Sequence, residues 1–400
     1  MSLPETTKDM ILRKAREIRA RQIQWRRHLH QHPELSDQEY ETTKFLKDKV
    51  RAMGLKVVPL KMKSGLIAEA HGNNPGKTVA IRTDIDALPI TEKTKLPYQS
   101  KADGIMHACG HDVHMAVALG TAAVISSLKK EFDGAVRFIF QPSEEMPPGG
   151  ARPMIANGAL KDVSMIFALH VDPHLHTGRI SLRDGVAMGA VTDFNLVIHG
   201  KGGHAARPHD AVDAIAAAAE VIDSLQKVIS REIDPIKPVV MTVGKIEGGT
   251  ARNAICDRVE LTATARALSQ DAARKLRTLI KRTAESVCKA RGAKAELMFV
   301  ADYPVLRNHP LANRILADNF QSLFRGHRIE QTPQVLGGED FACYLEKVKG
   351  AMFRLGTMNV KTGANKPWHS PQFKVDEDAM YYGTALMAAS ALDFLRNKSR

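Results

Sequence analysis

The feature that most constrains the fold is an alternation of apolar runs with helical stretches. Apolar runs at 78–81, 135–140 and 164–169 are separated by helical patterns near 113–130 and 150–159. Parallel strands need long crossover connections, so strands that alternate with helices predict a mostly parallel sheet covered by helices on both faces. We therefore expect a large α/β/α domain.

From about residue 190 the order of predicted elements changes to β-α-β-β-α-β, the order of a ferredoxin-like unit. After this unit, the alternation of helical stretches and apolar runs seen in the first part of the chain returns. We predict a discontinuous large α/β domain at 1–188 and 302–400 and an inserted small α+β domain at 189–301, because 400 residues exceed what one core usually supports. The strands of the inserted unit are expected at 192–199, 239–246, 259–267 and 295–300, its helices at 211–230 and 271–291, and the flanking helices at 7–30, 37–53, 309–325 and 339–347.

Composition and charge exclude several classes of protein. No stretch approaches the eighteen or so apolar residues that a spanning helix needs, and the polar N-terminus has no apolar signal segment, so we expect a soluble cytoplasmic protein. The net charge of +13 is spread along the chain without a nucleic-acid-binding motif, so no nucleic acid is expected as a partner. The four cysteines show no paired spacing and are expected as free thiols.

Polar side chains follow the predicted strands of the large domain. In open α/β sheets such groups collect at the carboxyl ends of strands, so they are expected along one rim. They are Asp84 and Asp86 after the first strand, Gln141, Glu144 and Glu145 after the second, His170 after the third, and Trp368 and His369 after the strand at 351–355.

The densest polar cluster is the segment His107–His114, which contains three histidines, one thiol and one carboxylate. These residue types are metal ligands. Gly110 interrupts helical regularity, so Cys109 and His111 can converge on a metal from a bent loop. A thiolate can also bridge two divalent ions.

Adjacent carboxylates at Glu144 and Glu145 form the second element of a hydrolytic site. Two neighbouring carboxylates repel unless a cation or proton intervenes. One can ligate a metal while the other takes a proton from the metal-activated water and passes it to the leaving amine. The chain has no G-x-S-x-G elbow, Walker A loop or G-x-G-x-x-G fingerprint, which disfavours acyl-serine, nucleotide and Rossmann chemistry.

With these residues in place, the sequence resembles the M20 metallopeptidase family, in its amidohydrolase branch of aminoacylases, hippurate hydrolases and auxin-conjugate hydrolases. The resemblance covers nearly the whole chain. It rests on Arg27–Ser36, Asp84–Pro89, His107–His114, Gln141–Glu145, Gly200–Pro208, Asn253–Ile255, Gly337–Phe341 and His369–Pro371.

The resemblance implies roles for individual residues. Cys109 would bridge two divalent metal ions, which His111, Glu145, His170 and His369 would also hold. The identity of the metals stays open between Zn, Mn, Co and Ni. Glu144 would be the general base and acid. His204 would donate to the oxyanion in the active site of a neighbouring subunit. Asn253 and Arg266 would bind the substrate carboxylate.

Other motif residues are expected to support the site. Asp86 and Asp112 are candidates for carboxylates that orient metal-bound histidines. The first three histidines of the chain are assigned to structure, bonded to nearby carbonyls, although the segment Pro33–Ser36 can still border the cleft. The roles of Asp84, His107, His114, Glu339 and Asp340 stay open.

The favoured function is metal-dependent hydrolysis of N-acyl-L-amino acids by metal-activated water. The alternative within the family is a carboxypeptidase or dipeptidase that acts on small peptides. A binding protein without turnover is disfavoured because every expected ligand and the base are present. The resemblance further implies that the small domain is a dimerisation and lid domain, which gives a homodimer, with a tetramer as the alternative, and no membrane partner.

Overall fold

The computed structural model describes residues 3–397, which form two compact units. The first contains the described residues up to Gly185, then Arg307–Pro333 and those from Cys343 onward; the second contains Val186–Leu306 and Gln334–Ala342. The sequence placed all of 302–400 in the large domain. The structure instead groups 334–342 with the second unit, where Val335 N donates to Ala187 O at 3.2 Å and Gly337 O accepts from Gly189 N at 3.0 Å.

The first unit is built on an eight-stranded sheet in the order β1-β2-β4-β3-β5-β16-β6-β15. The pairs β3–β4, β3–β5, β5–β16 and β6–β15 are parallel, and the other three are antiparallel. The central strands are buried along most of their length, as expected for a sheet covered by helices. The strands are β1 (Lys56–Val58), β2 (Leu66–His71), β3 (Thr78–Asp84), β4 (Ala135–Gln141), β5 (Val163–His176), β6 (Ile180–Leu182), β15 (Ile329–Gln331) and β16 (Gly350–Met358).

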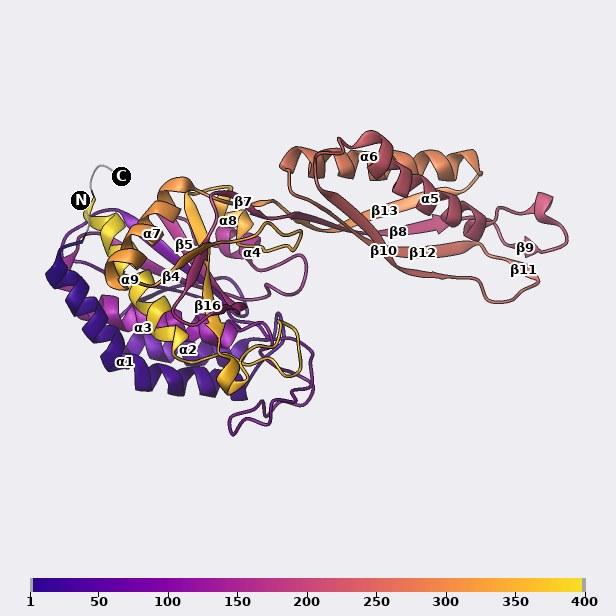
Figure 1. Cartoon of the computed structure of the whole chain (residues 1–400). Coiled ribbons are helices and arrows are strands. Elements are labelled where there is room, and N and C mark those ends of the chain that lie inside the picture. The colour runs from indigo at the N-terminus through magenta and orange to yellow at the C-terminus, as the bar shows by residue number, and fades with distance from the viewer. Residues whose placement is uncertain (1–2, 398–400) are drawn as a thin grey trace. The chain divides into compact units, whose positions relative to one another are not determined.

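Three long helices of the first unit pack on one another, and two of them, α3 and α9, also pack on the central strands (Figure 1). They are α1, α3 and α9, and α3 is apolar on nearly every side, as its almost complete burial requires. The helices of this unit are α1 (Glu5–Gln31), α2 (Tyr40–Ala52), α3 (His111–Ser127), α4 (Ala151–Ala156), α7 (Pro310–Leu323), α8 (Ala342–Leu345, which begins at the unit boundary) and α9 (Ala379–Arg396).

Strand β5 is longer than the sequence predicted, and the additional part carries His170. The predicted strand ended at residue 169, with His170 in the loop beyond it, but β5 continues to His176. Strand β16 pairs with this extension from His170 opposite Arg354 to Asp172 opposite Gly356, and again at His176 opposite Met358 after a register shift. His170 therefore stands on a rigid strand.

The second unit has a four-stranded antiparallel sheet in the order β10-β12-β8-β13. Helices α5 and α6 lie on one face of it (Figure 1). Residues of β12 alternate between buried and exposed, as a sheet covered on one face requires. The elements are β8 (Ala190–His199), β9 (Gly203–His204), α5 (Ala214–Glu232), β10 (Val239–Gly248), β11 (Ala254–Ile255), β12 (Arg258–Ala267), α6 (Gln270–Ala290) and β13 (Lys294–Tyr303), and β7 (Gly185–Met188) pairs with β14 (Leu306–Asn308).

The predicted fold class is confirmed: a mixed α/β protein with a mostly parallel central sheet and a separate β-α-β-β-α-β unit. Strand β2 was not predicted from the sequence. Across residues 3–397, no helix combines the length and apolarity that crossing a membrane demands.

Candidate metal centre and active site

Gly110 shapes the loop that carries the central thiol. It is the residue before α3 and has a φ of 96°, in the left-handed region that favours glycine. A Cβ at this position would lie 2.4 Å from Cγ2 of Val171, so a larger residue would also clash with β5. This turn brings Cys109 and His111 onto the same side, as the sequence predicted.

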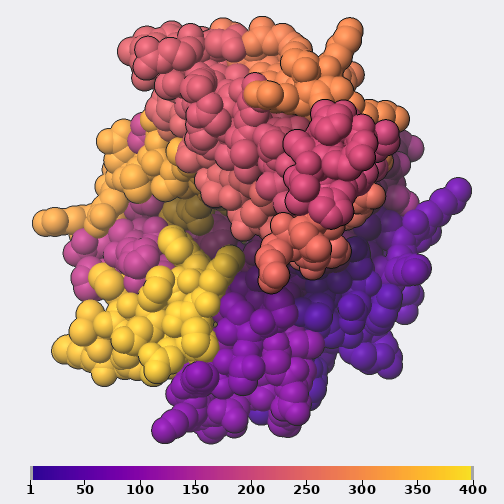
Figure 2. All heavy atoms as spheres, turned by 90° about the vertical axis from the view of Figure 1, so that its right-hand side faces the viewer, coloured from indigo at the N-terminus to yellow at the C-terminus, as the bar shows by residue number. Residues whose placement is uncertain are grey.

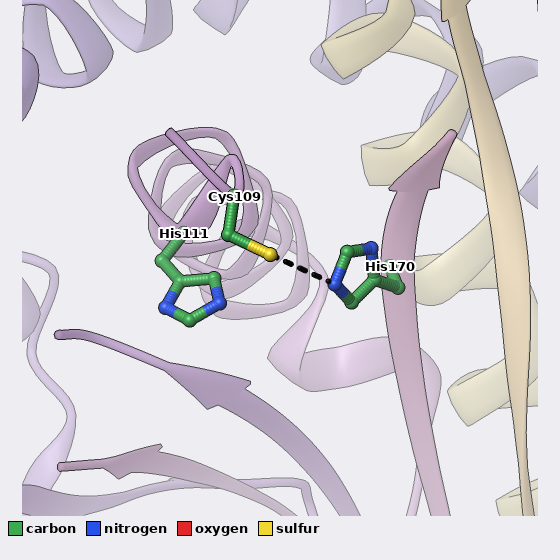
Figure 3. A group of neighbouring side chains, drawn as sticks. All are labelled: Cys109, His111 and His170. Atoms are coloured by element: carbon green, nitrogen blue, oxygen red, sulfur yellow. Dashed lines mark hydrogen bonds between the residues drawn. The ribbon is translucent and has the colours of Figure 1, made fainter. Parts of the chain in front are cut away.

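Cys109 faces His170 across a short gap. The Cys109 Sγ lies 3.4 Å from His170 Nε2, and Figure 3 shows the sulfur pointing at that ring, with His111 beside it. The Nδ1 of His170 bonds to Val171 O at 2.8 Å, so Nδ1 carries the proton and Nε2 keeps its lone pair. Trp368 Nε1 donates to the same carbonyl at 3.1 Å. One ligand atom from each of Cys109, His111 and His170 lies within 4.8 Å of the other two.

Asp86 orients His111. The Nδ1 of His111 lies 2.9 Å from Asp86 O and 3.2 Å from Asp86 Oδ1, which leaves Nε2 as the free lone pair. That Nε2 is buried, and within the described residues no hydrogen bond reaches it or Glu145 Oε1. The two atoms lie 3.8 Å apart. A buried imidazole nitrogen and a buried carboxylate oxygen that face each other fit a shared cation, whether a proton or a metal ion.

Glu144, Glu145 and His369 complete the cluster. Ligand atoms of His111, Glu144 and Glu145 lie within 4.8 Å of one another, and so do those of Cys109, Glu145 and His369. His369 Nε2 is 3.5 Å from Glu145 Oε1. The backbone N of His369 donates to Ala108 O at 2.9 Å, which ties the two ligand-bearing loops together.

The loop after β16 lies against the first half of the chain. Lys93 N donates to Pro371 O at 2.7 Å. Figure 2 shows the yellow surface of this C-terminal part beside the purple surface of the first unit. This contact holds the loop that carries Trp368 and His369 next to the thiol loop.

The donor set fits divalent metal ions. The five residues predicted as ligands fall into overlapping groups of three. Cys109, His111 and Glu145 each belong to two of these groups. Sulfur, imidazole and carboxylate together suit borderline divalent ions such as zinc. The structure thus brings together all five predicted ligands, and Glu144 lies beside them.

The electrostatics of the cluster favour a cation. Burial, and next the negative charge of Glu145, raise the pKa of the Cys109 thiol well above its ordinary value. Burial opposes charge on His111, but Asp84 and Asp86 outweigh it and raise the pKa of that histidine. Burial and the nearby Arg354 hold the pKa of His170 well below its usual range. A divalent cation would stabilise a thiolate here and offset the carboxylates.

The carboxylate of Asp112 pairs with Arg26 and His30, and within the described residues no hydrogen bond joins it to a predicted histidine ligand, contrary to the sequence expectation. This carboxylate lies 2.7 Å from Arg26 Nε and 2.9 Å from His30 Nδ1, and all three side chains are buried. His30 also corrects the sequence assignment, because it bonds to carboxylates and not to a backbone carbonyl. It lies on the buried side of α1, whereas His32 Nδ1 bonds to His28 O at 2.8 Å at the surface, as expected.

Two histidines whose roles were left open have different surroundings. His114 is fully engaged: Nδ1 lies 2.6 Å from Asp84 Oδ1, and Nε2 accepts from Val171 N at 2.9 Å. His107 is buried, and no hydrogen bond within the described chain reaches either ring nitrogen. Burial lowers the pKa of His107 to about 4, so the ring is neutral at physiological pH.

The remaining predicted site residues lie in the second unit. The short ladder between β9 and β11 places His204 opposite Ala254, and Ala205 N donates to Asn253 O at 3.1 Å, so His204 and Asn253 are neighbours. Arg266 lies near the far end of β12. The nine residues from Arg258 to Arg266 span about 26 Å of this strand.

Sequence reasoning missed two residues next to the cluster, Glu39 and Ser143. Ser143 N donates to Glu39 Oε1 at 2.8 Å, over a separation of 104 residues. The only local signal was their position: Ser143 lies beside the Glu144–Glu145 pair, and Glu39 follows the Pro33–Ser36 segment.

Comparison with known proteins agrees with this geometry. Residues 80–393 match the model of Peptidase family M20/M25/M40. The chain is 39% identical to an N-acetylcysteine deacetylase of Bacillus subtilis over 93% of this chain and 96% of that protein. It is 37% identical to thermostable carboxypeptidase 2 of Saccharolobus solfataricus, with coverages of 93% and 95%.

A solved structure extends the likeness to three dimensions. The YXEP protein of Bacillus subtilis, a dinuclear metal binding peptidase from the M20 family, superposes with a TM-score of 0.82 at 36% identity, over 96% of this chain and 99% of that one. The match of the family model to most of the chain and the high coverage by relatives lead to one conclusion. The chain belongs to peptidase family M20/M25/M40 and is a hydrolase of amide bonds.

Proposed function

We propose that the protein hydrolyses N-acyl-L-amino acids to a carboxylic acid and a free amino acid. The observation that carries this proposal is the convergence of Cys109, His111, Glu145, His170 and His369, with Glu144 at the edge of the cluster. The deacetylase relative from Bacillus subtilis acts, by its name, on an N-acyl amino acid, which supports this substrate class.

Two divalent metal ions per subunit would be held by these five residues. The dinuclear relative of known structure supports this number. When bound, such ions polarise a carbonyl and lower the pKa of a water molecule. The donor set suits Zn, Mn, Co or Ni.

Glu144 is the residue we assign to proton transfer. It lies in the group with His111 and Glu145, and its neighbour Glu145 is the carboxylate with the unbonded Oε1. Glu144 would take a proton from the attacking water and deliver it to the leaving amine, so that a poor leaving group departs as a neutral amine.

The test is hydrolysis by metal-free enzyme reloaded separately with Zn, Mn, Co or Ni, on N-acyl amino acids and on dipeptides. We expect release of free amino acid that depends on the metal. Glu144→Gln should lower kcat by about 10² to 10⁴ with the metal content unchanged. A variant that keeps more than about a tenth of the wild-type rate would show that Glu144 is not the base.

A carboxypeptidase or dipeptidase is the second candidate, because relatives at 37% identity are named thermostable carboxypeptidases. The same screen separates the two candidates through the ratio of kcat/KM for acyl amino acids to that for peptides. A ratio above one supports the first candidate, and a ratio well below one supports the second.

We also propose that the second unit forms a homodimer in which His204 and Asn253 serve the active site of the partner subunit, and that Arg266 receives the substrate carboxylate. The ladder between β9 and β11 supports a joint role for His204 and Asn253, because it places Asn253 beside the histidine that would act across the interface. His204 would donate to the oxyanion that forms at the scissile carbonyl.

Mixing two inactive variants tests this arrangement. A heterodimer of Glu144→Gln and His204→Ala contains one complete site if His204 acts across the interface, and none if it acts within its own chain. After unfolding and refolding of an equal mixture, we expect about a quarter of the wild-type activity. Activity no higher than that of the separate variants, with mixed dimers shown to be present, would refute action across the interface.

A further inference from the structure

We infer that Glu39 is a positioning residue for hydrolysis: it fixes the backbone that carries Glu144 by accepting a hydrogen bond from the amide of Ser143. The inference rests on the proposed function, because it gives Glu39 a role that acts through Glu144. Glu39 itself is assigned no contact with the substrate.

The peptide groups on both sides of Glu144 are each held by a buried carboxylate. Ser143 N donates to Glu39 Oε1 at 2.8 Å, and Glu145 N donates to Asp86 Oδ2 at 2.9 Å. Glu39 is 0% exposed and Asp86 is 1% exposed. Hydrogen bonds from amides to carboxylates are charge-assisted and hence strong, so these two anchors restrict the backbone of Glu144 from either side.

Ser143 needs such anchors because its backbone is strained. Its φ of 53° lies in the left-handed region, which a residue with a Cβ occupies at a cost. Its other polar groups are engaged as well. The Oγ of Ser143 accepts from Asp37 N at 2.8 Å and donates to Asp37 Oδ1 at 2.6 Å, and Gly150 N donates to Ser143 O at 2.9 Å. A strained residue held by its surroundings in this way is typical of a functional loop.

Glu39 is suited to hold this position. Its second carboxylate oxygen accepts from Ser64 Oγ at 2.9 Å, which fixes the side chain. Burial raises the pKa of Glu39 to about 7, and in either protonation state the carboxyl group keeps an acceptor oxygen for the amide. Three residues earlier, Ser36 Oγ donates to Asp86 Oδ2 at 2.7 Å. The short segment 36–39 therefore supports both anchors of Glu144.

The expected consequence is kinetic. A displacement of a catalytic group by about 1 Å can cost about 10²-fold in rate. Loss of the Glu39 anchor frees the peptide before Glu144 and leaves the Ser143 amide without a partner. The loss should therefore appear in kcat and leave KM for the substrate nearly unchanged.

The test compares Glu39→Ala with Glu39→Gln in metal-loaded enzyme. Glu39→Ala should lower kcat by about 10- to 100-fold, with KM changed less than about threefold and with full metal content. Glu39→Gln should retain about half of kcat or more, because the amide oxygen can accept from Ser143 N and the amide nitrogen can donate to Ser64 Oγ. A glutamine variant as slow as the alanine variant would overturn the inference.

A matched control lies in the second unit, outside the proposed machinery. Asp213 also accepts two backbone amides, from Ile215 at 2.9 Å and from Ala216 at 3.1 Å, but these belong to the start of α5. Asp213→Ala should destabilise the chain without lowering kcat of the folded, metal-loaded enzyme. An equal fall of kcat in Asp213→Ala and Glu39→Ala would mean that general destabilisation explains both.

A second variant covers the case in which Glu39→Ala does not fold. Glu39→Asp keeps the carboxyl group but shortens the side chain by one methylene, which withdraws its oxygens from Ser143 N and Ser64 Oγ. If the Glu39 anchor sets the position of Glu144, kcat should fall at least severalfold in the folded, metal-loaded variant. Unchanged kcat would overturn the inference.

Hydrogen exchange of the metal-free protein gives a readout that needs no turnover. Peptides that span the loop from Gln141 to Gly150 should exchange slowly in the wild type and at least tenfold faster in Glu39→Ala, with Glu39→Gln close to the wild type. Unchanged exchange in Glu39→Ala would overturn the inference. Absence of Glu144-dependent hydrolysis in the wild type, with the exchange result as expected, would overturn the proposed function and leave the anchoring intact.

Discussion

Two buried carboxyl groups near the site, those of Glu39 and Asp112, affect the stability of the fold in opposite directions when they ionise. Glu39 accepts two hydrogen bonds, yet its burial raises its pKa to about 7. Asp112 is equally buried, but Arg26 and His30 outweigh burial and hold the pKa of Asp112 far below its usual range. Ionisation of Glu39 therefore costs stability, whereas ionisation of Asp112 contributes to it.

The raised pKa of Glu39 predicts a specific pH dependence. The folded state binds the proton more tightly than the unfolded state, so the contribution of Glu39 is fully present below pH 4.5 and is lost as pH rises through about 7. Glu39→Gln removes this dependence, so the free energy of unfolding of the variant relative to the wild type should rise by about 3 kcal/mol between pH 4.5 and pH 8. Urea unfolding of both metal-free proteins at several pH values measures it, and parallel pH curves would contradict it.

At the scale of the secondary-structure elements, a buried ion pair joins helices α1 and α3. Arg26 on α1 contacts Asp112 on α3 at 2.7 Å, and both side chains are at most 1% exposed. Asp112 directly follows His111 at the start of α3. The pair thus joins α1 to the end of the helix that delivers a proposed metal ligand.

Breaking this pair should be costly. Arg26→Met leaves the carboxylate of Asp112 buried without its main counter-charge, which typically costs about 3–5 kcal/mol. The control on the same helix is Lys14→Met, because Lys14 and Glu17 form an exposed pair at 2.7 Å that should contribute less than about 1 kcal/mol. Urea unfolding of the two variants gives the comparison. Equal losses would mean that the buried pair has no special role in joining α1 to α3.

At the scale of the whole molecule, all five proposed metal ligands lie in the first unit, while His204, Asn253 and Arg266 lie in the second. Metal binding should therefore stabilise one unit and not the other. Both tryptophans of the chain, Trp25 and Trp368, also belong to the first unit, so their fluorescence reports on that unit alone.

Removal of metal by a chelator should lower the thermal midpoint seen by tryptophan fluorescence. A ligand at a thousand times its Kd stabilises the folded state by about 4 kcal/mol, which corresponds to a shift of several degrees. Amide exchange in helices α5 and α6 of the second unit should stay the same. An unchanged fluorescence midpoint would argue against metal binding by the cluster, and faster exchange in α5 and α6 would argue against confinement of the effect to one unit.

The sequence by itself determined those features of the fold and the site that depend on residues close together in the chain. The periodicity of apolar residues predicted most strands and helices, including the β-α-β-β-α-β order, because local geometry sets those periods. The His107–His114 and Glu144–Glu145 segments were readable for the same reason, since their ligands are neighbours in the chain. The resemblance to the M20 family then added His170 and His369 to the expected ligand set.

Tertiary structure decided everything that depends on partners distant in sequence. The pairing of β16 with β5 carried that strand past His170, and hydrogen bonds to 187 and 189 drew 334–342 into the second unit. The contacts of Asp112 with Arg26 and of Glu39 with Ser143 join residues 86 and 104 positions apart. No local pattern encodes such pairs, because each becomes favourable only after folding has buried both partners and removed the competing water.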